Sequence, residues 1–219
     1  MEWVWLIIVS VLFVAMSAGF IFGFAAEWQQ TSSRSRLRKG AHLVGTLLLL
    51  IGLTGFLGAA FSALGGLRWL PKTVEFPMGF AEHSATDNKG QLYCGSMGWA
   101  RIQVYDWDRH FLRGWFVNAY GGTFRLHVNG DGNLEIATAR QGMLYVYDEN
   151  GRLLSSQSDV RHYFEEFEHQ DEGGVLIPTR WFLWPFTNPF IGFGVLMVGM
   201  LFLGLARHTK QQAKGRVKG

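Results

Sequence analysis

Hydrophobic residues gather into three long blocks along the chain, at residues 3–26, 41–67 and 182–206. The first and third blocks contain no charged residue, and the second contains only His42 as a group that could carry charge. Each block reaches the length of about 20 residues that a helix needs to cross the hydrocarbon core of a bilayer. The pattern predicts transmembrane helices over residues 1–28, 41–67 and 182–206.

The first block could instead be a cleaved signal peptide. Signal peptides begin with a basic stretch before a short apolar core. This chain opens with MEWVW, which has an acidic residue and no lysine or arginine, and its apolar run continues to residue 26. We therefore expect a retained helix.

Basic residues indicate which segments stay in the cytoplasm. The link at residues 29–40 holds four of them and the tail at residues 207–219 holds five, and neither contains an acidic residue. Positively charged loops remain inside, so the N-terminus and residues 68–181 are predicted to lie outside. This outer segment has 11 basic and 15 acidic residues, a net charge of −4. A nucleic-acid partner is therefore not expected.

The composition favours a bacterial inner membrane with a periplasmic domain. The chain has no Asn-x-Ser/Thr glycosylation site, and its single cysteine, Cys94, excludes an internal disulfide. An unpaired cysteine outside could cross-link two chains. The alternative, which we favour, is a buried small apolar residue.

From residue 101 onward, short alternating segments replace the long apolar blocks. RIQVYDWD, FRLHVNG and MLYVYDENG alternate apolar and polar residues, as half-buried strands do. Turn sequences separate them, at NGDGN from Asn129 and at DENGR from Asp148. We expect an antiparallel meander of about six strands, whereas residues 72–98 show no assignable pattern.

An amphipathic helix is predicted after the meander, in SDVRHYFEEFEH from Ser158. Its apolar residues recur at the spacing of one helical face. They are Val160, Tyr163, Phe164 and Phe167. We expect this helix to cover one face of the sheet.

Two segments of the meander repeat each other 42 residues apart. VYDWDRHFL from Val104 and VYDENGRLL from Val146 share Val-Tyr-Asp, a polar turn and two large apolar residues, although the first lacks the turn glycine. Residues 101–157 resemble an NHL-type β-propeller blade with half of its neighbour, on VYDENGRLL and on FRLHVNGDGNLEIATAR with its DGN turn. The resemblance implies a scaffold and no catalytic residue.

The chain departs from that family in the number of repeats. Propellers close with typically 4–8 blades, whereas residues 68–181 hold fewer than three units of 42 residues. An open sheet leaves an unpaired edge, which proteins cover, pair or charge. We therefore expect a partner or the membrane surface to complete the domain.

Small residues in the apolar blocks predict close helix packing. The glycines expected at helix contacts are Gly19, Gly23, Gly52, Gly55 and Gly58. No acidic or basic residue lies deep inside a block, which disfavours an ion pump or channel. The blocks are therefore predicted to be anchors.

No pattern indicates catalysis or a bound metal. His83, Cys94 and Met97 are of copper-ligand types, but no second histidine lies near the cysteine. NGDGNLE loosely resembles a Ca²⁺ loop, and a hairpin turn explains the same residues. A G-x-S-x-G elbow is absent. We expect no cofactor, no metal and no enzymatic activity.

Aromatic and arginine residues of the outer segment are the candidates for partner contact, because both are enriched at interface centres. They are Trp99, Trp107, Trp115 and Arg113. Packing within the sheet is the alternative for the aromatic residues. Trp107 is the strongest candidate, because it lies in a turn.

These patterns predict an α+β membrane protein with three transmembrane helices, an extracytoplasmic antiparallel β-meander and one amphipathic helix. The predicted function is docking of a partner protein, as an accessory or assembly subunit of a membrane complex. The partner would be another membrane or periplasmic protein, or a second copy. A periplasmic sensor for a ligand such as cell-wall sugar, and an immunity protein against a secreted toxin, are the alternatives.

Overall fold

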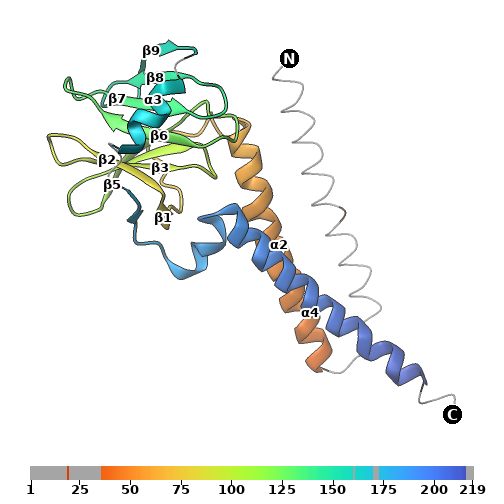
Figure 1. Cartoon of the computed structure of the whole chain (residues 1–219). Coiled ribbons are helices and arrows are strands. Elements are labelled where there is room, and N and C mark those ends of the chain that lie inside the picture. Colours follow the sequence, from red (N-terminus) through yellow and green to blue (C-terminus); the bar gives the residue numbers. More distant parts are fainter. Residues whose placement is uncertain (1–18, 20–35, 160, 170–172, 216–219) are drawn as a thin grey trace. The chain divides into compact units, whose positions relative to one another are not determined.

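The computed structural model describes residues 36–159, 161–169 and 173–215, together with residue 19 (Figure 1). The chain divides into a helical unit, which ends at residue 58 and resumes at residue 188, and a β-rich unit between them. The described chain is α+β with antiparallel sheets, as the sequence predicts.

Helices α2 (Arg36–Ala63) and α4 (Pro189–Gly215) form the described part of the helical unit. Within the described residues, Lys39–Ala63 is the one helix whose length and composition suffice to cross a membrane. The apolar part of α4, Pro189–Leu205, is shorter. Three spanning helices are therefore not supported, and the helix expected at residues 1–28 lies outside the described residues except for Gly19.

The third apolar block becomes α-helical later than the sequence predicts. Trp181–Phe186 forms a 3₁₀-helix, η2, which contains Pro185, and α4 begins only at Pro189. Proline lacks the N–H group that a helix interior needs but is accommodated in the first turn. The two prolines therefore shift the start of α4 away from residue 182.

Helices α2 and α4 touch through glycines. A Cβ atom at Gly52 would lie 2.3 Å from the Leu196 backbone N, and one at Gly199 would lie 2.6 Å from the Leu49 backbone N. Neither distance leaves room for a side chain. The two backbones are in direct contact, as in the packing of helices through small residues.

The β-rich unit contains two four-stranded antiparallel meanders and one two-stranded pair (Figure 1). The first sheet consists of β2 (His83–Thr86), β3 (Leu92–Ser96), β4 (Arg101–Tyr105) and β5 (Phe111–Phe116). The second consists of β6 (Phe124–Val128), β7 (Leu134–Thr138), β8 (Leu144–Tyr147) and β9 (Leu153–Gln157). β1 (Phe80–Ala81) pairs with β10 (Val175–Leu176). About six strands was too few, because β1, β2 and β3 lie in the stretch without clear alternation.

The 42-residue repeat extends over both four-stranded sheets. Leu92 faces Tyr105 across the first sheet, and Leu134 faces Tyr147 at the same register of the second. The register shifts at the same place in both outer hairpins. The repeated sequence therefore corresponds to the β4–β5 and β8–β9 hairpins of a four-stranded unit that occurs twice.

Equivalent turns in the two copies are closed by the same hydrogen bonds. Asp87 Oδ1 accepts bonds from the backbone N–H groups two and four residues later, and Asn129 Oδ1 does the same. Asp148 repeats this pattern in the outer turn of the second copy. Asp and Asn side chains stabilise turns in this way. NGDGN is thus a turn, as the simpler interpretation predicts.

The two sheets pack face to face around a shared core. The first sheet contributes one face of the repeated unit to this core, and the second sheet contributes the opposite face. β4 contributes Ile102 and Val104 to this core, whereas β8 contributes Tyr145 and Tyr147. Tyr147 corresponds to Tyr105 of the first copy, which points away from the shared core. The copies therefore stack like successive units of a repeat array, whose end faces need caps.

Segments outside the repeat cap both end faces. Met78 and Ile177 pack on the outer face of the first sheet. On the second sheet, Phe167 packs against Leu144. The capping helical segment consists of α3 (Arg161–Glu166) and the 3₁₀-helix η1 (Phe167–His169). Tyr163, Phe164 and Phe167 pack on the sheet, as the amphipathic pattern predicts, but the α-helix is only six residues long. Val160 lies outside the described residues.

Candidate functional site

Strand β4 is buried on both faces, although its sequence RIQVY predicts one polar, exposed face. Its two aliphatic residues point into the shared core. Arg101, Gln103 and Tyr105 are also fully buried. Hydrogen bonds between these side chains and the backbone of residues 74–76 explain this, because that segment runs over the polar face.

Gln103 holds Phe76 through both ends of its amide. The Phe76 backbone N–H donates to Gln103 Oε1 at 2.6 Å, and Gln103 Nε2 donates to the Phe76 carbonyl oxygen at 2.9 Å. Gln103 Nε2 also donates to the Tyr105 hydroxyl oxygen at 3.2 Å. The buried backbone groups of Phe76 thereby gain partners without a neighbouring strand, as buried polar groups require.

Arg101 is stacked between two aromatic rings. Its Cζ atom lies 4.8 Å from the centroid of Phe76 and 4.5 Å from that of Phe116, and Nη2 donates to the Val74 carbonyl oxygen at 2.7 Å. Burial lowers the pKa of Arg101 to about 10, so the guanidinium stays charged at neutral pH. The lack of a side chain at Gly114 on β5 makes room for the Arg101 guanidinium, because a Cβ there would lie 3.0 Å from Arg101 Nη2.

Tyr105 connects this buried layer to Glu75. Partial burial raises the pKa of Glu75, and the interaction of its carboxylate with the Tyr105 hydroxyl opposes that shift. Burial and then the charge of Glu75 raise the pKa of Tyr105, so this phenol stays protonated and remains a donor at neutral pH.

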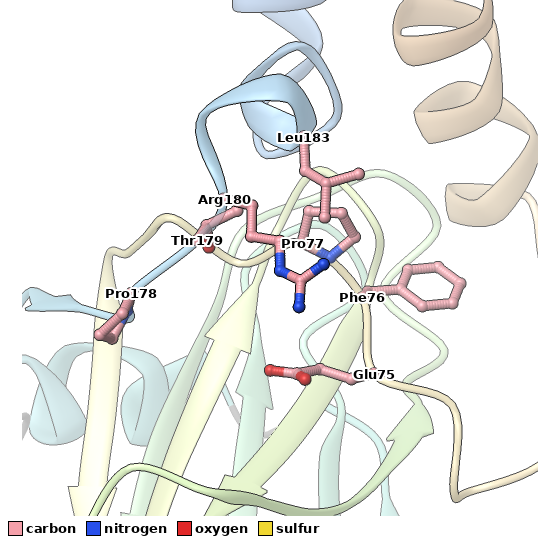
Figure 2. A pocket seen from close by; sticks show the side chains of 7 residues that line it. All are labelled: Glu75, Phe76, Pro77, Pro178, Thr179, Arg180 and Leu183. Carbon is pink, nitrogen blue, oxygen red and sulfur yellow. The ribbon is translucent and has the colours of Figure 1, made fainter.

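Glu75 opens onto a hollow of about 200 Å³ in the surface of the β-rich unit. The lining residues are Glu75, Phe76, Pro77, Pro178, Thr179, Arg180 and Leu183. Figure 2 shows the Arg180 guanidinium and the Glu75 carboxylate pointing toward each other across this space. The site therefore offers one cationic and one anionic group inside a largely apolar rim.

Hydrogen bonds to Gly79 position the far wall of the hollow. Gly79 N–H donates to Thr179 Oγ1 at 3.0 Å, and Ile177 N–H donates to the Gly79 carbonyl oxygen at 2.7 Å. Gly79 has a φ of +61°, a conformation that glycine adopts without strain. This anchorage holds residues 177–180 beside residues 75–77.

The second copy of the repeat has no equivalent of this polar layer. Met143, Tyr145 and Tyr147 stand where the first copy has Arg101, Gln103 and Tyr105. Tyr145 and Tyr147 are packed into the shared core instead. The two copies have thus diverged at the positions that support the hollow.

The structure separates the tryptophans that the sequence places at a partner surface. Trp99 is buried, and its Nε1 donates to the Phe186 carbonyl oxygen at 2.7 Å. Trp115 is buried in the shared core. Trp107 is 84% exposed in the turn between β4 and β5. Only Trp107 of the three offers its ring to a partner.

Arg113 joins the two copies of the repeat. Its Nε donates to the Glu149 carbonyl oxygen and its Nη2 to Gln91 Oε1, both at 2.6 Å. The Glu149 carboxylate also pairs with Lys89 of the first copy. The side chain of Arg113 is therefore engaged within the domain.

The glycines expected at helix contacts fall into three groups. Gly52 meets α4 directly, while Gly55 is buried and Gly58 is half-buried on the same helix. Gly19 has no neighbour within 4 Å of a Cβ among the described residues. Gly23 lies outside the described residues.

The residue types that suggest copper do not converge. Cys94 is buried in the outer core of the first sheet, whereas Met97 packs against the shared core. Within the described segments, no group of three or more His, Cys, Asp or Glu residues is placed to hold a metal ion. Burial of Cys94 agrees with its interpretation as a small apolar residue.

Strand β9 is an open edge of the second sheet. All five of its residues, LLSSQ, are exposed, and none is charged. The equivalent strand β5 is flanked by the chain itself, because Gly114 N–H donates to the Lys72 carbonyl oxygen at 2.8 Å. No strand within the described residues pairs with the outer side of β9. The sequence predicts an unpaired edge but does not show that β9 forms it, although the uncharged LLSSQ was a signal.

Neither the family models nor the curated proteins contain a match to this sequence.

Proposed function

We propose that this chain is a non-enzymatic membrane-anchored protein whose extracytoplasmic β-sheet domain docks a partner protein. It would act as an accessory or assembly subunit of a membrane complex, in the inner membrane of a bacterium. The observation that carries this proposal is the open, uncharged edge of β9. The apolar blocks would anchor the chain, and the basic link and tail would keep residues 68–181 outside.

The stacking of the two four-stranded units supports a relationship to propeller blades. Their order of strands, their 42-residue period and their head-to-tail contact fit two successive blades of an NHL-type array. Capping of both end faces by the chain itself means that no further blade is needed there. What remains for a partner is the edge of a sheet.

Docking at β9 would occur by strand addition, in which an extended segment pairs with an exposed sheet edge. Main-chain hydrogen bonds then supply affinity, and the exposed side chains of Leu153 and Leu154 supply apolar contact. Arg152 and Asp159 flank the strand with opposite charges. A matching partner strand is therefore uncharged in its centre and carries opposite charges at its two ends.

A second copy of this chain has that chemistry, and it is the occupant to which we commit. Two β9 strands that pair antiparallel about the midpoint of Ser155 and Ser156 place Arg152 of each copy opposite Asp159 of the other. Such an interface uses the same surface on both subunits, as two-fold symmetric dimers do. The charge pattern of β9 is thus complementary to itself.

The 42-residue repeat provides a matched pair of variants to test this edge. Leu154→Lys adds a charge to β9, and Leu112→Lys adds the same charge at the equivalent exposed position of β5. Light scattering of the full chain, extracted in mild detergent, reports the oligomeric state. We expect a dimer for the natural protein and for L112K, and a monomer for L154K, because edge charges oppose strand pairing.

The same preparations identify other occupants. A different protein that co-purifies with the natural chain and with L112K, but not with L154K, would place a foreign strand on β9. Natural protein and L154K that are both monomeric and bring down the same proteins would exclude docking at this edge.

A second candidate function, a ligand-binding module, is favoured by the hollow beside Glu75 and Arg180. The polar layer that supports it occurs in only one of the two copies, which is unexpected if its role were only to stabilise the repeat. A thermal shift of the full chain on addition of a small ligand would test this function.

A further inference from the structure

The hollow beside Glu75 presents two opposite charges to the same space. Glu75 and Arg180 are both exposed residues whose side chains point toward each other in Figure 2. The ion pairs found among the described residues involve other side chains, so no ion pair of 4.0 Å or less joins these two. Each group therefore keeps hydrogen-bonding capacity for a ligand.

The size of the hollow limits what it can hold. Its volume of about 200 Å³ is below the roughly 300–1,000 Å³ of pockets for drug-sized ligands. It exceeds the roughly 150 Å³ of a cavity that holds benzene. A small polar group of a few heavy atoms fits this range, whereas an oligosaccharide chain does not.

The charges define the chemistry of the ligand. A guanidinium binds phosphate or carboxylate oxygens in fixed geometry, so Arg180 selects an anion. The Glu75 carboxylate accepts hydrogen bonds and selects a group that donates them, such as a primary ammonium. A zwitterion with both groups on a short link satisfies the site.

Exposed aromatic side chains that follow Arg180 in the sequence indicate where such a zwitterion comes from. Trp181 is 83% exposed, and Phe182 and Trp184 are 49% and 47% exposed. These residues follow Arg180 directly and precede the apolar segment Pro189–Leu205 in the sequence. Trp and other amphipathic aromatics at the end of an apolar segment lie at the level of lipid headgroups.

We propose that this hollow binds the phosphoethanolamine group of an aminophospholipid, with the phosphate on Arg180 and the primary ammonium on Glu75. The choline headgroup carries a quaternary ammonium that cannot donate a hydrogen bond to Glu75. The glycerol headgroup has no ammonium at all. The site therefore discriminates among common phospholipids by their headgroups. This inference assigns a ligand to the ligand-binding function and does not depend on docking at β9.

The test uses the full chain in detergent micelles and short-chain lipids. Isothermal titration compares dihexanoyl phosphatidylethanolamine, phosphatidylcholine and phosphatidylglycerol with free phosphoethanolamine. We expect phosphatidylethanolamine to bind about tenfold more tightly than the other two lipids, and E75Q and R180Q each to remove about that factor. The matched controls E82Q and R109Q change exposed residues outside the hollow and should leave the affinity unchanged.

The outcomes separate the source of the ligand from the existence of the site. Equal affinities for phosphatidylethanolamine and free phosphoethanolamine would support the site with a soluble zwitterion as its ligand. Equal affinities for all three lipids, or affinities that E75Q and R180Q do not alter, would overturn it. Arg180 makes no described side-chain hydrogen bond, so R180Q keeps the test valid if E75Q fails to fold. Failure here leaves dimerisation through β9 unaffected, because L154K reports on that edge separately.

Discussion

Arg109 and Gly151 occupy the same turn position in the two copies of the repeat, and their φ angles are +65° and +68°. Glycine adopts this left-handed conformation without strain, whereas a residue with a side chain loses roughly 1–2 kcal/mol there. The glycine is also required by packing, because a Cβ at Gly151 would lie 2.3 Å from the Trp115 ring. The first copy therefore keeps a strained turn that the second copy avoids.

Substitutions at these two positions should act in opposite directions. Arg109→Gly should raise the free energy of unfolding by about 1 kcal/mol, because it removes the backbone strain. Gly151→Ala should lower it by about 2 kcal/mol or more, through strain and overlap with Trp115. Denaturation of the full chain in detergent measures both. A stabilising effect of Gly151→Ala would contradict this account.

Arg113 is expected to contribute to stability by joining the two copies. Arg113→Met keeps an unbranched apolar chain in place of the aliphatic part of arginine but removes the hydrogen bonds to Glu149 and Gln91. It should lower the free energy of unfolding by about 2–3 kcal/mol. Arg109→Met, at an exposed arginine of the turn that precedes β5, should cost about 0.5 kcal/mol or less. Chemical denaturation compares the two. Equal effects would show that Arg113 does not couple the sheets.

Glu75 should make stability depend on pH in a predictable direction. Its pKa is raised above 4.5 in the folded protein, chiefly by burial. The folded state then binds more protons than the unfolded state between the two pKa values, so the contribution to stability falls as pH rises through that interval. Glu75→Gln removes this loss. The melting temperature of E75Q minus that of the natural protein should therefore be larger at pH 7 than at pH 4. A difference that does not change with pH would contradict the raised pKa of Glu75.

Gly52 should be indispensable for contact between α2 and α4. Gly52→Leu would place a side chain against the Leu196 backbone and should destabilise the helix pair by about 2 kcal/mol or more. Gly194→Leu is the control, because a Cβ at Gly194 meets nothing within 4 Å among the described residues. Loss of helical structure during titration with a harsh detergent measures the difference. Equal resistance of both variants would exclude close packing at Gly52.

The 42-residue repeat shows which strands of each copy can be recognised from repeated letters in the sequence. VYDWDRHFL and VYDENGRLL carry the signal because both keep Tyr followed by the turn Asp. The inner turn is also repeated, but Asp87 in DNKGQ and Asn129 in NGDGN perform one role with different residues. A comparison of letters therefore recovers the outer hairpin and misses the first strands of each copy.

The tryptophans show why exposure was harder to predict. Trp99 and Trp107 lie just before and just after β4, and Trp115 lies within β5. The local pattern of the sequence does not predict which of the three is exposed. Trp99 is covered because residues 74–76 and 186 come back over it, at distances along the chain that no periodicity marks. Only Trp107, in a turn of its own hairpin, has an exposure that local sequence predicts.

The sequence by itself determined the apolar segments, the duplicated hairpin, the turns and the amphipathic helix, because each depends on residues within a few positions of one another. Only the tertiary structure decided that the polar face of β4 is buried, that both ends of the stack are capped and that β9 remains open. Those outcomes depend on where irregular segments such as residues 74–77 and 177–180 come to rest. Such segments have no hydrophobic period, and their positions follow from single hydrogen bonds and ring contacts with side chains far along the chain.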